Sequence, residues 1–160
     1  MTKERLKEIL DHVRGQGDLV AKNGITYCNI ALNRVLGFCD MDKLMAKSGE
    51  PMLANDMCDH FRDSSDWQKI DGYSATSRAM QGILVIACQK GPRHGHVAPV
   101  YPSPMEYSAS WQKEVPILSN VGKDNVLQRA SKCFQTEPTH SFNFSSDVYI
   151  VTGAYYYRNW

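Results

Sequence analysis

Residues 83–101, ILVIACQKGPRHGHVAPVY, decide how the second half of the chain folds. The run Ile83–Cys88 is continuously apolar, which is typical of a buried strand. Residues 89–93 have the glycine and proline chemistry of a turn. Side chains then alternate between the two faces of a second strand, with His94, His96, Ala98 and Val100 on one face and Val97, Pro99 and Tyr101 on the other. This stretch therefore predicts two strands joined by a hairpin turn.

Helical patterns precede this hairpin. Apolar side chains recur at helical spacing in residues 3–14, 27–36 and 51–62, so each segment should present one apolar face. Thr26 is the expected N-cap of the second helix, and Pro51 should lie in the first turn of the third. A short helical turn is also expected around residues 77–80.

Two further segments, residues 115–121 and 147–156, are strand candidates. Helices therefore come first and an antiparallel sheet follows, which is the order of the α+β class. No internal repeat or linker is visible in the sequence. Residues 1–160 are therefore expected to form one domain, in which N-terminal helices pack on a small antiparallel β-sheet.

The composition narrows the possible partners. The chain has 160 residues and a formal net charge of +1, from 18 Lys and Arg against 17 Asp and Glu. Binding to nucleic acid or to anionic membranes needs a basic excess, so neither is expected. No apolar run of about 18 residues is present, which argues against membrane insertion. The charged amphipathic pattern of residues 3–14 is not that of a signal peptide, so synthesis in the cytoplasm is expected.

The five cysteines form an odd set without a CxxC motif, which favours reduced thiols over a disulfide framework. Cys58 and Cys88 fall on apolar stripes and are expected in the core, whereas Cys39 and Cys133 are expected to be partly exposed. A zinc site built from Cys39, Cys58, His60 and His94 or His96 lacks the usual ligand spacing. No metal or other cofactor is therefore expected.

Cys28 stands at the opening of the second predicted helix, on its apolar face. A helix N-terminus presents unpaired N–H groups and a partial positive charge, which favour a thiolate and can hold an oxyanion. Cys28 is therefore a candidate nucleophile. Free cysteines are also among the most buried residues, so the same position fits a small core residue, and this alternative stays open.

His96 lies on the strand after the turn, among small and apolar residues. It could take the cysteine proton and later protonate a leaving amine, or it could be a hydrogen-bonded histidine of the core. His94 lies on the same face but nearer the turn, and ranks second as the base. Asn120 could hold the imidazole through its other nitrogen, or could simply close its strand before Gly122.

In combination, these residues resemble the papain-like cell-wall hydrolases of the NlpC and CHAP kind. The resemblance spans roughly residues 24–125 and keeps the family's order of cysteine, histidine and polar residue. It rests on Thr26-Tyr27-Cys28-Asn29, on the run Ile83–Ala87 leading into Gly95-His96-Val97-Ala98, and on Ile117-Leu118-Ser119-Asn120. The family's fold is a cysteine-bearing helix on a small antiparallel sheet, and its usual activity is cleavage of amide bonds in peptidoglycan peptides.

The resemblance implies roles for particular residues. Cys28 would attack a carbonyl carbon, His96 would serve as base and then acid, and Asn120 would hold the ring. The Cys28 N–H, with the Tyr27 side chain, would stabilise the oxyanion. Residues expected to line the substrate site are Asn29, His94 and Trp67, the last on a segment, residues 51–70, that also contains Asn55 and could form a wall of the groove.

Two positions depart from the family's pattern. Pro99 stands where an aliphatic residue usually continues the strand, and because proline donates no ladder hydrogen bond, this strand should be an edge strand or bulged. Asn120 stands where many relatives have His or Glu.

The resemblance also implies a substrate and a site of action. The substrate would be a peptidoglycan peptide, reached in the periplasm or cell wall by a phage lysin or a secreted antibacterial effector. An effector would have an immunity protein that inhibits it by plugging the groove. Two alternatives remain at this level: a non-catalytic binding domain, and a Cys/His acyl hydrolase or transferase that acts on a substrate outside the wall.

Overall fold

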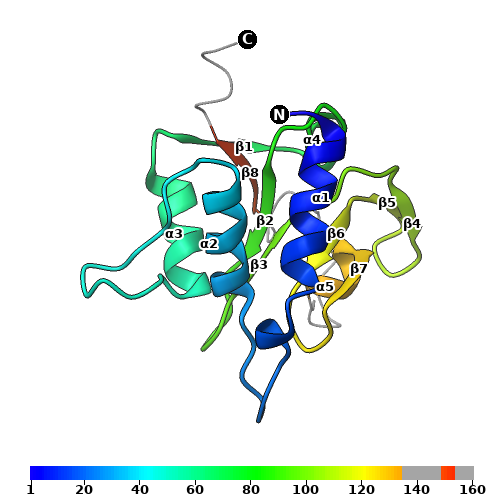
Figure 1. Ribbon diagram of the computed structural model, residues 1–160. Helices are drawn as coiled ribbons and strands as arrows, with labels where there is room; N and C mark the ends of the chain where they lie inside the picture. Colours follow the sequence, from blue (N-terminus) through cyan, green and yellow to red (C-terminus); the bar gives the residue numbers. More distant parts are fainter. Residues whose placement is uncertain (135–148, 154–160) are drawn as a thin grey trace.

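The computed structural model describes residues 1–134 and 149–153 (Figure 1). The helices are α1 (Lys3–Arg14), the 3-10 helix η1 (Gly17–Leu19), α2 (Cys28–Phe38), α3 (Ala54–Asp63), α4 (Gly72–Met80) and α5 (Ala130–Cys133). The strands are β1 (Trp67–Ile70), β2 (Val85–Gln89), β3 (His96–Pro99), β4 (Glu106–Ser108), β5 (Lys113–Val115), β6 (Ile117–Asn120), β7 (Val126–Arg129) and β8 (Tyr149–Gly153). The class is α+β, as the order of the sequence patterns predicts.

The central sheet has four strands in the order β1-β8-β2-β3, and every neighbouring pair is antiparallel. β2 and β3 form the predicted hairpin, in which Gln89 pairs with His96 and Ile86 with Pro99. β3 is the last strand of this sheet, as expected for a strand that contains a proline. An isolated bridge from Val100 to Leu118 then connects this edge to the two-stranded β6–β7 sheet.

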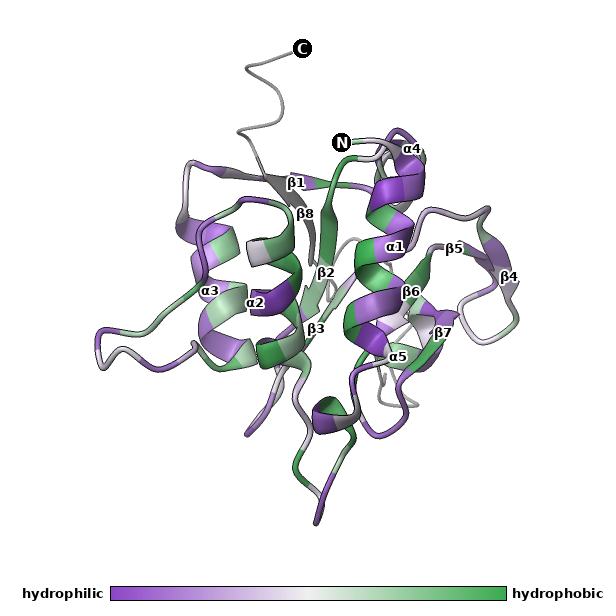
Figure 2. Cartoon of the chain, in the orientation of Figure 1, coloured by the Kyte–Doolittle hydropathy of each residue, from purple (hydrophilic) through white to green (hydrophobic). Residues whose placement is uncertain are grey.

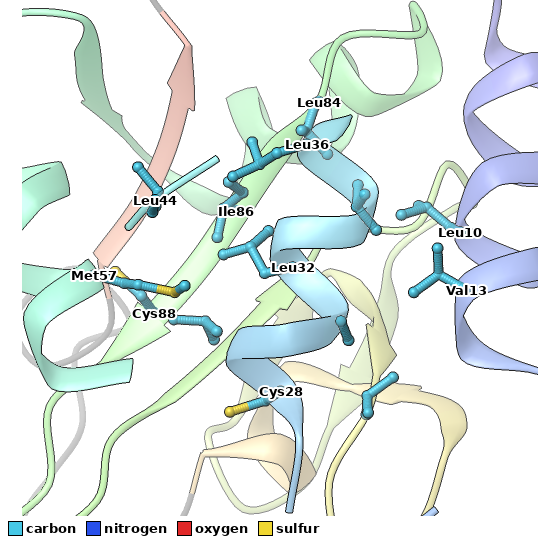
Figure 3. Packing of buried hydrophobic residues seen from close by; sticks show 14 of the residues in the cluster. Leu10, Val13, Cys28, Leu32, Leu36, Leu44, Met57, Leu84, Ile86 and Cys88 are labelled. Atoms are coloured by element: carbon cyan, nitrogen blue, oxygen red, sulfur yellow. The ribbon is translucent and has the colours of Figure 1, made fainter. Parts of the chain in front are cut away.

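Helices α2 and α3 stand in front of β2 and β3, and α1 stands beside α2, where it contacts β6 (Figure 1). The apolar stripes of α1 and α3 face the core while their exposed faces are mostly polar, and α2 between them is apolar along most of its length (Figure 2). Figure 3 shows Leu32 and Leu36 of α2 close to Ile86 of β2, with Leu10 and Val13 of α1 on the far side of α2. Packing of these stripes fixes α2, and therefore its first residue, against the sheet.

The alternation predicted for residues 94–101 is confirmed by the two buried clusters of the protein. Val97 and Tyr101 belong to the cluster that contains the helices α1 to α3. Ala98 and Val100 belong to the other cluster, with Phe134 and residues of α4 and β6. Both faces of β3 are therefore covered, and a polar side chain on this strand needs a hydrogen-bond partner.

Several element boundaries differ from the sequence-based prediction. Thr26 does not cap α2: Tyr27 occupies the N-cap position and makes no side-chain capping bond. α3 begins at Ala54, and Pro51 instead pairs with Met45 in an isolated bridge. α4 is a full helix of nine residues, because Asp71 caps it by accepting the N–H of Ser74.

The remaining differences concern short strands. β1, β4, β5 and β7 and the short helix α5 were not expected from the sequence. Of the predicted strand at residues 147–156, residues 149–153 are β8 and the others lie outside the described residues. Within the described ranges, no helix combines the length and the apolar character needed to cross a lipid bilayer.

Candidate functional site

The first residue of α2 lies against the first residues of β3. Cys28 is 7% exposed, at the opposite end of α2 from Leu36 (Figure 3). Its Sγ is within hydrogen-bonding reach of the backbone N–H of Val97 and of the N–H groups of Asn29 and Cys28 itself. This contact is with the backbone of Val97, which directly follows His96, whereas the His96 ring itself packs against Phe134 of the other buried cluster.

His96 is held from two sides. Its Nε2 lies 2.7 Å from Oδ1 of Asn120, which is the last residue of β6. The ring also packs edge-on against Phe134, with the ring centroids 5.6 Å apart and an interplanar angle of 61°. Gly122 lies beside the ring, since a Cβ there would be 3.6 Å from the His96 Cε1. The imidazole is therefore fixed in position and orientation.

The hydrogen bonds of Asn120 decide which nitrogen of His96 carries the proton. Asn120 is buried, and its Nδ2 donates to the backbone carbonyl of Asp124 at 2.8 Å. The amide oxygen must then face His96, and because this oxygen can only accept, Nε2 of the ring must donate. Nδ1 of His96 is therefore the nitrogen with a lone pair, which is the form that a general base requires.

At neutral pH the Cys28 thiol and the His96 imidazole are both uncharged, so no thiolate or imidazolium is present in the resting protein. Burial raises the pKa of the Cys28 thiol, although the N–H groups of Val97 and Asn29 act in the opposite direction. Burial also lowers the pKa of His96, partly offset by the hydrogen bond to Asn120. The structure thus corrects the expectation that the helix N-terminus keeps a thiolate at Cys28: desolvation is the larger effect, so the resting thiol is protonated and the imidazole is neutral.

The side chain of Asn55, on α3, forms two hydrogen bonds with the turn before β3, and we call these two bonds the Asn55 clamp. The amide of Asn55 donates from Nδ2 to the Gly91 carbonyl at 3.0 Å and accepts the Gly91 N–H at Oδ1 at 3.1 Å. Gly95 passes so close to this amide that a Cβ there would overlap Asn55 Oδ1 and lie 2.7 Å from the Gln89 carbonyl oxygen. The residue before His96 must therefore be glycine for this packing to persist.

Of the four residues expected to contact the oxyanion or the substrate, Tyr27, Asn29 and His94 lie close in the chain to Cys28 or His96, and Trp67 does not. Tyr27 is partly buried at the N-cap of α2 and packs on the helix-side core. Asn29 donates from Nδ2 to the Met52 carbonyl at 2.9 Å, so its side chain fastens the segment before α3. His94 is exposed in the β2–β3 turn. Tyr27 and Asn29 flank Cys28 in the chain, and His94 precedes His96 by two residues.

The structure does not bring Trp67 to this group. β1 is the edge strand opposite β3, with β8 and β2 between them. Trp67 pairs with Gly153 of β8, at the end of the sheet away from Gln89 and His96. Its ring packs edge-on against Phe61 at 4.6 Å, so Trp67 anchors α3 to the sheet and does not line a groove at Cys28.

The other cysteines lie in the packing of the protein. None of the five cysteines, which all lie in the described part of the chain, forms a disulfide. Cys58 and Cys88 are buried in contact with each other, which raises the pKa of Cys88. Cys133 is partly exposed as expected, but Cys39 is buried, because it closes α2 against α1. Among the described residues, no three His, Cys, Asp or Glu side chains gather as metal ligands would.

The sequence indicates Cys28, His96 and Asn120, but not the groups that fix them. Phe134 lies 38 residues after His96 in the chain, and no periodic pattern connects the two. Asp124 contributes only a backbone carbonyl, which any residue type would supply. Comparisons with known proteins find no family model that matches this chain and no curated protein that is significantly similar to it.

Proposed function

We propose that the protein is a cysteine hydrolase that cleaves amide bonds in the peptides of bacterial peptidoglycan. The observation that carries the proposal is that the Cys28 sulfur meets the backbone N–H of Val97, the residue after His96, whose ring is held by Asn120. A partly buried histidine with a tautomer fixed by an amide, on a strand whose backbone meets a cysteine at a helix N-terminus, is an arrangement that nucleophilic catalysis could use.

The proposed reaction has two halves. His96 Nδ1 takes the thiol proton as the Cys28 sulfur attacks the carbonyl carbon of the amide. The tetrahedral intermediate then collapses to a thioester as the C–N bond breaks, and His96 gives its proton to the leaving amine. In the second half, His96 removes a proton from water as the water oxygen attacks the thioester. The C–S bond then breaks, His96 returns the proton to the departing sulfur, and a carboxylic acid and the Cys28 thiol are released.

The developing oxyanion has donors within the first turn of α2. The N–H groups at a helix start have no partner within the helix, and the helix dipole adds partial positive charge at the same place. We assign the Cys28 N–H to the oxyanion, with Tyr27 beside it at the N-cap. Because burial raises the pKa of Cys28, deprotonation accompanies the attack on substrate and does not precede it.

The papain-like assignment and the wall substrate rest on the resemblance of residues 24–125 to the NlpC and CHAP hydrolases. The α+β architecture, with a cysteine-bearing helix on an antiparallel sheet, supports it. The site of action would be the periplasm or cell wall, as for a phage lysin or a secreted antibacterial effector. If the protein is an effector, an immunity protein that covers Cys28 is the expected inhibitor.

Digestion of purified sacculi tests the proposal. Wild-type protein should release new amines and stem-peptide fragments, identified by mass spectrometry, and Cys28→Ala should release none. Cys133→Ala is the matched control, because it makes the same chemical change at a partly exposed cysteine and should keep full activity. Turnover of another acyl donor without any release from sacculi would overturn the wall substrate. Equal activity of wild type and Cys28→Ala would overturn the catalytic role.

A further inference from the structure

The turn between β6 and β7, residues 121–125, controls the orientation of the Asn120 amide. Asn120 Nδ2 donates to the carbonyl of Asp124, a residue exposed to solvent, at 2.8 Å. If this carbonyl moved away, the two ends of the amide would be free to exchange places. The NH2 group would then face His96 Nε2, which would have to accept, and the ring proton would move to Nδ1.

Asn125 fixes the position of this turn. Its Oδ1 accepts the Gly122 N–H at 3.2 Å, which closes the turn on itself. Its Nδ2 donates to the Leu19 carbonyl at 3.1 Å, which ties the turn to η1. Leu19 is buried in the helix-side core, so the far end of this connection is anchored in packed structure. Asn125 therefore connects a rigid part of the fold to the loop that bears the Asp124 carbonyl.

We propose that Asn125 is a positioning residue that selects the Nε2–H tautomer of His96. It acts through the turn, the Asp124 carbonyl and the Asn120 amide. The result is that Nδ1 of His96 stays unprotonated and can accept a proton. The expected effect of Asn125 on turnover rests on the proposed hydrolase function. The tautomer itself is a property of the resting protein, whatever its substrate.

The direct measurement is the nitrogen chemical shift of His96 in uniformly labelled protein, at a pH where the imidazole is neutral. Wild type should show a protonated Nε2 and an unprotonated Nδ1. In Asn125→Ala the chemical shifts of Nδ1 and Nε2 should move toward each other, because both tautomers become populated. A wild-type ring with its proton on Nδ1 would overturn the proposal without any variant.

Two further variants separate the bonds of Asn125. Asn125→Asp keeps an acceptor for the Gly122 N–H but places a carboxylate beside the Leu19 carbonyl, so it should release the anchor to η1 and mix the tautomers as Asn125→Ala does. Lys123→Ala is the matched control, since it is exposed in the same turn and should leave the His96 shifts unchanged. Circular dichroism establishes that each variant is folded.

Kinetics on a wall peptide provide the second readout. Asn125→Ala should lower kcat by about ten- to a hundredfold and leave KM near its wild-type value, because the base is misoriented while the substrate site is intact. Wild-type tautomer and wild-type kcat in folded Asn125→Ala would overturn the proposal. Failure of wild type to cleave sacculi, with the expected shifts of His96, would instead count against the proposed function alone.

Discussion

The Sγ of Cys28 and the backbone N–H of Val97 lie within hydrogen-bonding reach, so that the nucleophile candidate contacts the strand residue next to His96. Core packing sets α2 against the sheet, and this contact places its first residue beside β3. The same N–H can stabilise a thiolate once the proton has left. In the proposed mechanism, that proton passes from Cys28 to His96.

The first prediction concerns pH. In the resting protein, burial raises the pKa of Cys28 and lowers that of His96, so both groups are neutral around pH 7. Activity needs the neutral imidazole, so kcat/KM should fall only as the pH drops through a value below the ordinary 6.5 of histidine. Burial raises the pKa of Cys28 above its ordinary 9.0, so the rate of Cys28 alkylation by iodoacetamide should still be rising with pH above 9.

Asn120→Ala provides the control for this prediction. The bond to Asn120 raises the pKa of His96, so its removal should move the acidic limb of the activity profile to still lower pH while kcat falls. Mass spectrometry of each alkylated cysteine separates Cys28 from the other thiols. An alkylation rate for Cys28 that stays constant down to pH 6 would show a standing ion pair and would contradict the neutral description.

The second prediction concerns Gly95, the residue before the candidate base. A methyl group there would overlap the Asn55 amide and lie 2.7 Å from the Gln89 carbonyl, and neither is the free end of a flexible chain. Gly95→Ala should therefore shift the turn and His96 with it, at a cost of about 1–3 kcal/mol in the free energy of unfolding. Activity should fall by about a hundredfold, because a small displacement of a catalytic group has that effect.

Gly17→Ala is the matched control for Gly95→Ala. A Cβ at Gly17 meets no heavy atom within 4 Å, so the same substitution should change neither stability nor activity by a comparable amount. Denaturant unfolding and the sacculus assay measure the two effects separately. Retention of wild-type kcat in Gly95→Ala would show that the Asn55 clamp does not set the position of His96.

The sequence predicts the parts of this fold that depend on periodic burial. The stripe of α1 and the apolar run of β2 follow directly from side-chain spacing, and both are confirmed. The alternation at His96, Val97 and Ala98 is confirmed for the same reason, since a strand with two covered faces must direct adjacent side chains into different clusters.

The missed parts depend on contacts that no local pattern encodes. Thr26 has a side chain suited to capping, but α2 starts one residue later, where packing of Cys28 against β3 determines its first turn. The short strands β4, β5 and β7 exist because a neighbouring strand completes their hydrogen bonds. Phe134 contacts His96 only through the tertiary fold. Sequence spacing could therefore indicate the three candidate site residues, but not what holds them.

The third prediction tests the attachment of the segment before α3. Asn33 is buried on α2, where its Nδ2 donates to the Leu44 carbonyl at 3.1 Å and its Oδ1 accepts the Leu44 N–H at 2.7 Å. Asn33→Ala leaves both backbone groups of buried Leu44 without these partners, and should lower the free energy of unfolding by about 2–3 kcal/mol. Asn29→Ala removes only the single bond to the Met52 carbonyl, and should cost less. Urea unfolding that ranks Asn29→Ala as the more damaging variant would contradict this account.

The fourth prediction concerns stability at alkaline pH. Burial raises the pKa of Cys39 from 9.0 to about 11 and that of Cys133 from 9.0 to about 12. Above pH 9 the unfolded chain loses these thiol protons while the folded protein keeps them, so the folded state binds more protons and its stability must fall as the pH rises. Each thiol should contribute a loss of up to about 1.4 kcal/mol per pH unit between pH 9 and 11.

The double variant Cys39→Ala/Cys133→Ala isolates these two thiols from the lysines and tyrosines that titrate in the same range. Its stability at pH 7.5 should be lower than that of wild type, because Cys39 fills space in the core. Its dependence on pH above 9 should nevertheless be flatter, since two of the groups that bind protons more tightly in the folded state are gone. Urea unfolding at several pH values measures both quantities, and an unchanged slope in the double variant would mean that Cys39 and Cys133 ionise as readily in the folded protein as in the unfolded chain.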